Sequence, residues 1–342
     1  MRFKRLARTI TLVPLLAPSL LSAISLIYWF GNQGVLKDLL TALGIEQIYG
    51  AAGIVLAESF STFPHALMIL VTSLAAADAR LYEAADAMGT TARRKFFTIT
   101  LPGAKYGLIS AALVTFTLVI TDFGIPKVIG GSFNVLATDV FKLVIGQQDF
   151  AKGAVVAILL LAPALLTFAV DSYVSRRQTA MLTARAVPYA PKPSRGFDFA
   201  MTLFCSLIAL LVLAMLGMAI FASLASFWPY NLTPSLRHYV LGLVDAEVGV
   251  GFVNSLKMAG ATALFGTALV FCGAYLLEKT KGMDSLRGLV RLLAMLPMAV
   301  PGLVLGLGYI FFFNEPTNPL NGLYHTDTLL TLCTIVHFYT TG

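Results

Sequence analysis

The side chains most capable of chemistry lie inside apolar stretches of the sequence. Glu58, Ser59, Thr62 and His65 fall within one apolar run, and Asp122 ends the next. An unpaired carboxylate in hydrocarbon costs at least about 2 kcal/mol, so an ionisable residue inside a membrane span is a functional candidate. We expect these residues to line a pathway for a polar solute. The alternative is that Glu58 and His65 only make hydrogen bonds between helices of a bundle.

A second group of residues has regular spacing within a polar, basic hairpin, residues 78–103. Its regularly spaced positions are Glu83-Ala84-Ala85, then Gly89, and then Ile99-x-Leu101-Pro102. Such a pattern has no nucleophile or metal-ligand cluster, so it predicts contact with another molecule rather than a reaction. The alternative is an ordinary loop between two spans whose basic residues only reflect membrane topology.

Local rules predict the conformation of this hairpin. Asp78 is a suitable N-cap for a helix over 79–88, and Gly89 is able to end that helix with a positive φ. Thr90 or Thr91 is expected to cap a second helix, and Pro102 suits the first turn of a third. The chain would then turn sharply twice. One face of the first helix would carry Ala84, Ala85 and Met88, and its small residues would permit close approach by another protein.

The composition indicates a membrane protein. Hydrophobic residues make up 58% of the chain and charged residues 12%, whereas a soluble domain carries about 25% charged residues. The net charge of +7 comes from basic residues in short segments between apolar runs, which excludes a nucleic-acid-binding surface as its explanation. The lipid bilayer is therefore the first expected partner.

The hydropathy pattern predicts an all-α, polytopic bundle with eight spans. These are 9–30, 50–77, 104–122, 151–171, 199–223, 252–277, 288–313 and 327–341. Pro14 and Pro18 are expected to kink the first. Most of the 24 Lys and Arg residues fall on one side of this arrangement, which places the N-terminus and the hairpin in the cytoplasm.

An internal repeat divides the chain. The segment 14–18, Pro-Leu-Leu-Ala-Pro, aligns with 297–301, Pro-Met-Ala-Val-Pro, and aromatic residues follow each at the same distance. We therefore expect a first half over 1–171, a basic linker over 172–197 and a second half over 198–342. The second half would end before its own copy of the hairpin.

The hairpin closely resembles the EAA loop of ABC-importer permeases, whose fixed positions are all met by the residues given above. The resemblance implies a type I ABC importer permease fold and a transport role in the bacterial inner membrane. It also implies that the hairpin couples the permease to a separate ATPase dimer, with Glu83, Arg93 and Arg94 as polar partners. ATP and Mg would bind to that ATPase and not to this chain, and a periplasmic solute-binding protein would deliver the solute.

Four segments resemble the fused permeases for 2-aminoethylphosphonate, and the first two of them are shared with ferric-iron permeases, so the cargo assignment rests on the linker and the second half. They are 122–131, 134–139, 186–191 and 296–302. The resemblance implies that a complete protein has twelve spans, so that helices three to six of the first half and one to four of the second are present here. It favours 2-aminoethylphosphonate as the cargo, with Glu58 meeting its ammonium group, and leaves ferric iron or another small solute as the alternative.

Two other classes of function remain as alternatives. The sequence has no G-x-x-x-x-G-K-[ST] phosphate-binding loop, so an ATP-driven process needs a separate subunit. A proton-coupled secondary transporter would instead use Glu58, His65 and Asp122 as a relay, but that class leaves the hairpin pattern unexplained. A membrane enzyme is disfavoured because the sequence shows no catalytic or metal-ligand constellation.

Overall fold

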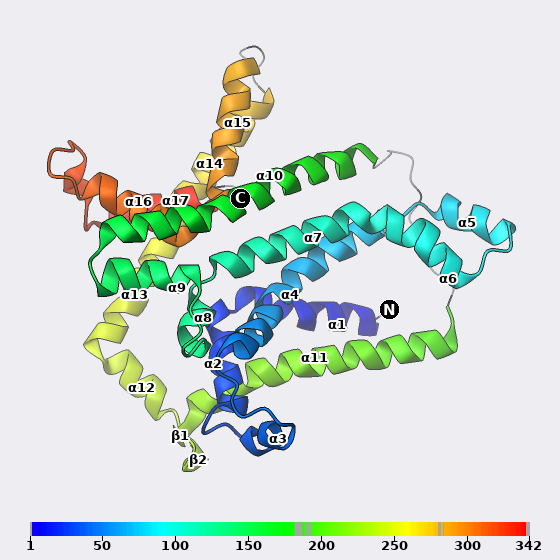
Figure 1. Ribbon diagram of the computed structural model, residues 1–342, viewed down its shortest axis with the longest axis horizontal. Helices are drawn as coiled ribbons and strands as arrows, with labels where there is room; N and C mark the ends of the chain where they lie inside the picture. Colours follow the sequence, from blue (N-terminus) through cyan, green and yellow to red (C-terminus); the bar gives the residue numbers. More distant parts are fainter. Residues whose placement is uncertain are drawn as a thin grey trace. The chain divides into compact units, whose positions relative to one another are not determined.

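The structure is a computed structural model that describes residues 2–181, 187, 189, 193–279, 282 and 284–339. Helices form most of the described chain (Figure 1), which confirms the all-α prediction. The strands β1 (Ala225–Phe227) and β2 (Asn231–Pro234) pair in a two-stranded sheet. Because helices satisfy their own backbone hydrogen bonds, they are the elements that a sequence of this hydropathy is able to place in lipid.

The helices before residue 135 are α1 (Arg2–Leu12), η1 (Val13–Leu16), α2 (Ser19–Phe30), α3 (Lys37–Ala42), α4 (Ala51–Ala75), α5 (Ala79–Ala87), α6 (Ala92–Lys95), η2 (Phe96–Thr100), α7 (Leu101–Thr121) and α8 (Gly124–Ile129). After them come α9 (Leu136–Phe141), η3 (Lys142–Gly146), α10 (Phe150–Met181), α11 (Arg195–Leu224), α12 (Arg237–Val244), α13 (Ala246–Ala261), η4 (Thr262–Gly266), α14 (Thr267–Lys279), α15 (Asp284–Ala299), α16 (Gly302–Phe313), η5 (Asn321–Leu323) and α17 (Asp327–Phe338).

Five helical stretches in the described chain are long and apolar enough to cross a membrane. They are Ala51–Ala75, Ala92–Thr121, Phe150–Asp171, Arg195–Leu224 and Glu247–Lys279. They correspond to the second through sixth predicted spans. The predicted kink of the first span is confirmed. The described parts of the seventh and eighth predicted spans form shorter apolar helices instead of one long helix each.

Prolines explain the two interrupted spans. The chain bends by 102° between the helical segments Leu6–Leu16 and Ser19–Phe30, so the two segments make at most one broken span. Helices α15 and α16 are likewise separated at Val300 and Pro301. A proline has no N–H to donate and keeps the preceding residue out of the helical region. The last segment, α17, has 12 residues and is about 18 Å long, against about 30 Å of hydrocarbon.

The backbone shows the predicted repeat at these breaks. Pro18 (φ −57°, ψ 140°) precedes α2, and Pro301 (φ −54°, ψ 137°) precedes α16. Each proline is the N-cap of a helix of 12 residues that ends in aromatic residues. The two segments therefore share a local conformation as well as a sequence pattern.

Contacts group the chain into two compact units whose limits differ from the sequence division at 171 and 198. The first contains Met1–Val135 and Leu166–Thr233, and the second contains Leu136–Leu165 and Pro234–Gly342. Helix α11, assigned by sequence to the second half, packs with α1 and α2 of the first unit. The Trp29 Nε1 atom of α2 donates to the Ala214 carbonyl of α11 at 3.1 Å. Helix α10 contributes residues to both units.

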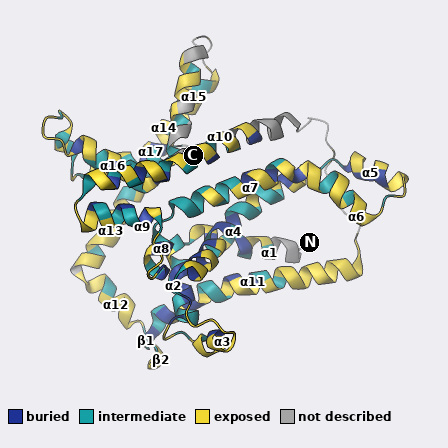
Figure 2. Cartoon of the chain, in the orientation of Figure 1, coloured by how far each residue is buried: buried dark blue, intermediate teal, exposed yellow. Residues whose placement is uncertain are grey.

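The first unit has its core where α2, α4 and α8 meet, and Figure 2 shows buried residues on α2 and α4. The buried members of this core are Ala23, Leu26, Leu40, Ile48, Ile54, Ala57, Ile125 and Ile129. Helix α7 packs along α4 with a close approach at Gly107, where an added Cβ would come within 2.3 Å of the Ser73 Cβ. A hydrogen bond of 2.6 Å from Ser110 Oγ to Asp171 Oδ1 joins α7 to α10.

The second unit has a smaller core of Val140, Val144, Ala157 and Leu307. These residues come from α9, η3, the first part of α10 and α16. The rings of Phe150 and Phe311 meet edge to face with centroids 5.9 Å apart. Much of α13 and α14 remains exposed, as expected for helices that face lipid or another helix.

Candidate functional site

The hairpin begins with α5, whose two ends are fixed by local hydrogen bonds. At its start, Asp78 Oδ1 accepts a hydrogen bond from the Arg80 amide at 3.1 Å. At its end, Gly89 has φ +70°, and the amides of Gly89 and Thr90 donate to the carbonyls of Asp86 and Ala85, both at 3.0 Å. This is the Schellman arrangement that favours glycine. The predicted N-cap and the predicted glycine turn are both confirmed.

The two faces of α5 differ from the sequence prediction. Ala79, Tyr82 and Ala85 are buried, whereas Leu81, Ala84 and Met88 are exposed, Leu81 by 57% and Met88 by 76%. The prediction that Ala84 and Ala85 share one face is therefore wrong, because Ala85 lies on the buried side of α5 and Ala84 on the exposed side. We call Leu81, Ala84 and Met88 the outer face of α5. The side chain of Glu83 is exposed beside it.

The returning leg is one continuous helical stretch, Ala92–Thr121. Thr91 caps it by accepting a hydrogen bond from the Arg94 amide at 3.4 Å, as predicted. The predicted second turn before Pro102 is wrong, because η2 is a π-helical segment that continues the helix from α6 into α7. Proline clashes with the carbonyl four residues earlier, and a local π turn relieves that clash.

The remaining residues of the pattern occupy distinct positions along this leg. Arg93 and Arg94 are exposed, while Lys95 forms an ion pair with Asp86 inside the hairpin. Ile99 is partly buried in η2, and Leu101 and Pro102 are exposed at the start of α7. The arginines are thus available to another molecule, whereas Lys95 holds the two legs together.

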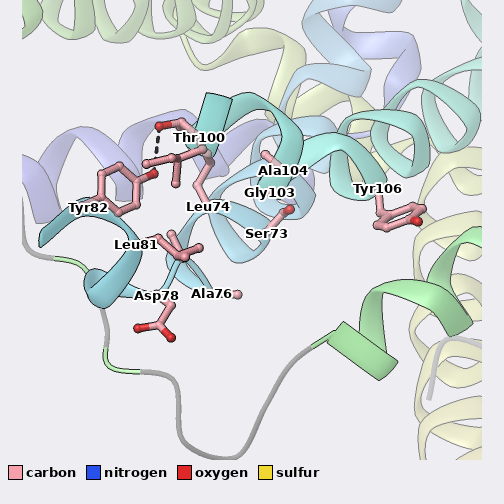
Figure 3. A pocket seen from close by; sticks show the side chains of 12 residues that line it. Ser73, Leu74, Ala76, Asp78, Leu81, Tyr82, Thr100, Gly103, Ala104 and Tyr106 are labelled. Carbon is pink, nitrogen blue, oxygen red and sulfur yellow. Dashed lines mark hydrogen bonds between the residues drawn. The ribbon is translucent and has the colours of Figure 1, made fainter. Parts of the chain in front are cut away.

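Two residues outside the pattern also join the two legs. The hydroxyl groups of Tyr82 in α5 and Thr100 in η2 are hydrogen-bonded at 2.8 Å. Figure 3 shows Tyr82 reaching across the hairpin to Thr100. The two residues line a pocket of about 230 Å³ between the hairpin and the adjoining ends of α4 and α7. Neither Tyr82 nor Thr100 was predicted from the sequence. The sequence indicated this contact only through the position of the aromatic Tyr82 directly before Glu83.

The predicted pathway residues form a polar seam where α2, α4 and α8 meet. Glu58 is 4% exposed, and its carboxyl group interacts directly with that of Asp122. Asp122 also accepts hydrogen bonds from Ser19 Oγ at 3.1 Å and from the Ile125 amide at 2.8 Å. The Oε1 atom of Glu58 has no hydrogen-bond partner among the described residues. Two carboxyl groups this close repel each other unless a proton or cation is present.

The other three pathway candidates all lie on α4, and they occupy different positions relative to Glu58. Thr62 is buried one turn along α4, and its hydroxyl donates to the Glu58 carbonyl at 2.7 Å. His65 lies two turns along from Glu58, with a buried Nδ1 atom that has no partner among the described residues. Ser59 lies on the exposed side of α4 and donates to the Val55 carbonyl. The seam therefore includes Glu58, Thr62, His65 and Asp122, but not Ser59.

Metal ligation is not indicated at this seam. Within the described ranges, no group of three or more His, Cys, Asp or Glu side chains is arranged to hold a metal ion. The arrangement presents instead the buried carboxyl group of Glu58, the partly buried carboxyl group of Asp122 and the hydroxyl group of Ser19.

Comparison with known proteins supports a transport role. Residues 1–180 match the family model for the binding-protein-dependent transport system inner membrane component. A ferric transport system permease protein FbpB of Actinobacillus pleuropneumoniae is 26% identical over 93% of this chain and 47% of its own length. A putative ferric transport system permease protein FbpB 1 of Haemophilus influenzae is 26% identical over 91% of this chain and 50% of its own length.

Another relative matches a smaller part of the chain. The molybdenum transport system permease protein ModB of Azotobacter vinelandii is 27% identical over 53% of this chain and 82% of its own length. No solved structure matches the chain. The chain spans about half the length of the ferric relatives, while the matched family model covers more than half of the chain. The chain therefore belongs to the family of inner-membrane components of binding-protein-dependent transport systems.

Proposed function

We propose that this chain forms part of the permease of an ATP-driven importer in the bacterial inner membrane, with its N-terminus and hairpin in the cytoplasm. The hairpin docks on a separate ATPase dimer through the outer face of α5. The observation that carries this proposal is the exposed apolar face of a short helix whose two ends are both fixed by hydrogen bonds. An apolar surface on a cytoplasmic loop needs a partner, and the flanking Glu83, Arg93 and Arg94 supply polar contacts at its rim.

The hairpin is built to transmit movement into the bundle. In this proposal the ATPase dimer, which holds the ATP and Mg, closes and displaces α5. The ion pair of Lys95 with Asp86 and the hydrogen bond of Tyr82 with Thr100 tie α5 to the returning leg. That leg continues without a break into α7, and α7 contacts α4 closely at Gly107. Displacement of α5 is therefore passed to the helices that carry the polar seam.

The cargo we propose is ferric iron, delivered by a periplasmic solute-binding protein. The support is that the two ferric permeases match more than nine tenths of this chain, whereas the molybdenum relative matches about half. The 2-aminoethylphosphonate predicted from the linker and the second half has no support in these comparisons. It stays a prediction that the uptake assay below tests in parallel.

Uptake by the intact transporter in proteoliposomes tests this function. We expect uptake of radiolabelled ferric iron to require the binding protein, the ATPase and ATP, and to be insensitive to an uncoupler. Uptake of labelled 2-aminoethylphosphonate in place of iron, under the same conditions, would identify 2-aminoethylphosphonate as the cargo and would still support an ATP-driven mechanism. Uptake that collapses with an uncoupler and needs no ATPase would contradict the mechanism and favour a proton-coupled transporter.

We further propose that the carboxyl pair of Glu58 and Asp122 lies on the solute pathway and meets a cation there. Replacing Glu58 with Gln keeps the size of the side chain, removes its ability to carry a negative charge and lets an amide donate to Asp122. We expect the E58Q transporter to unfold at the same or a higher temperature, because the repulsion is gone, while its uptake falls about tenfold. Uptake is measured in proteoliposomes and unfolding in detergent.

The matched control is Ser59→Ala, one residue along α4 on the exposed side. It should leave uptake unchanged because Ser59 does not reach the seam. Normal uptake by the E58Q variant would contradict a pathway role and leave the pair as an interhelical contact.

A further inference from the structure

Between α10 and α11 the structure describes Val187 and Tyr189 of the predicted linker, and both contact the hairpin through their backbone. The Ala79 amide donates to the Val187 carbonyl at 2.8 Å, and the Tyr189 amide donates to the Ala77 carbonyl at 3.2 Å. This is the pattern of an antiparallel bridge, with the two bonds flanking Asp78. The Val187 amide also donates to Asp78 Oδ1 at 3.4 Å. The carboxylate that caps α5 therefore accepts bonds from the helix and from the linker.

An aromatic stack strengthens this contact. The rings of Tyr82 and Tyr189 are nearly parallel, at 15°, with centroids 3.8 Å apart. Tyr82 is 6% exposed, because one ring face is covered by Tyr189 while its hydroxyl group reaches Thr100. Tyr82 is thus held from both sides, by the returning leg and by the linker.

These contacts converge on the point about which α5 would pivot. Asp78 and Ala79 are the first residues of the hairpin, and the contact at Tyr82 lies one turn further along α5. Without the linker, α5 would keep its N-cap and its glycine turn but lose the covering of its inner face. Its direction relative to α7 would then depend more heavily on the bond to Thr100 and the ion pair of Lys95.

We propose that the linker positions the coupling hairpin, with Tyr189 as the positioning residue that fixes the direction of α5. This inference rests on the proposed coupling role of the hairpin. The linker thereby acts as a third support of the hairpin, beside its two legs, and helps to convert ATPase closure into movement of α7. A hairpin without this support yields to the ATPase and transmits less of the displacement.

The test compares Tyr189→Ala with Tyr189→Phe in the intact transporter, reconstituted with its ATPase and binding protein. We expect Tyr189→Ala to retain the ATPase during purification but to lower solute transported per ATP hydrolysed by about threefold to tenfold, the range that corresponds to one aromatic stack. Tyr189→Phe keeps the stack and should behave as the unchanged protein. Val187→Ala is the matched control, because Val187 contacts the hairpin through backbone atoms.

Hydrogen exchange gives a readout that does not depend on transport. We expect Tyr189→Ala to speed exchange of the amides across α5 while exchange in α7 is unchanged. Transport per ATP and α5 exchange that both equal those of the unchanged protein would overturn the proposal. An equal transport loss in Val187→Ala would also overturn it, by removing the special role of Tyr189. If the unchanged transporter needs no ATPase, the coupling role itself fails, and that result is seen before any variant is compared.

Discussion

Replacing Gly89 with valine is expected to abolish uptake while the protein still inserts in the membrane. Gly89 has φ +70°, a conformation that costs an L-residue about 1–2 kcal/mol and a β-branched residue more. A Cβ at this position meets no atom within 4 Å, so the backbone conformation is the sole penalty. Relief of that strain rearranges the end of α5 and moves Met88 on its outer face. Uptake is compared with the amount of protein in the membrane fraction.

The structure offers two controls for this substitution. Gly89→Asn should retain most of the uptake, because asparagine tolerates the left-handed conformation. Gly103→Val places the same side chain in the returning leg, where the glycine has no positive φ and no neighbour within 4 Å. Normal uptake by the Gly89→Val protein would argue against a coupling role for the hairpin.

Replacing Gly107 with leucine is expected to have the largest effect on stability. A Cβ at Gly107 would lie 2.3 Å from both the Cβ and Oγ atoms of Ser73. Ser73 is short and buried, so α4 and α7 must separate rather than one side chain rotating away. Overpacking of this kind costs about 1–3 kcal/mol. We expect thermal unfolding of the purified protein at a lower temperature, together with loss of uptake.

Gly103→Leu is the control for this change, one turn earlier on α7. Because a side chain at Gly103 meets open space, this variant should unfold at the temperature of the unchanged protein. If both leucine variants unfold alike, the close contact between α4 and α7 is not what stabilises the first unit.

The parts of the hairpin that depend on neighbouring residues were predictable from sequence. Asp78 caps α5 and Gly89 ends it, because capping and left-handed conformations are decided within one or two turns. The inner face of α5 was not predictable. Ala85 lies on the same buried side of α5 as Tyr82, and the ring of Tyr82 is covered by Tyr189, which is distant in sequence. Helical spacing alone does not specify which face of a short helix meets such a partner.

The spans show a similar division between local and distant causes. Five apolar segments formed the expected helices, and Pro64 and Pro163 are accommodated inside two of them. The first span breaks at Pro18, as its prolines predicted, and the seventh breaks at Pro301, which was not predicted. Each of these prolines follows another proline by four residues, so two N–H donors one turn apart are missing. The polar seam was predictable in its residue types, but the side of α4 that Ser59 occupies was set by packing.

The measurement that most directly tests the account is cysteine cross-linking of the hairpin in the intact complex. Cys205, Cys272 and Cys333 are first replaced by alanine, and a single cysteine is placed at Met88 or at Ala85. We predict that Met88→Cys forms a cross-link to the ATPase, since Met88 is 76% exposed, and that Ala85→Cys, at a position 3% exposed, does not. Two results would contradict a cytoplasmic hairpin that docks on the ATPase: labelling of Met88→Cys by an impermeant thiol reagent from the periplasmic side, or the absence of a cross-link between Met88→Cys and the ATPase.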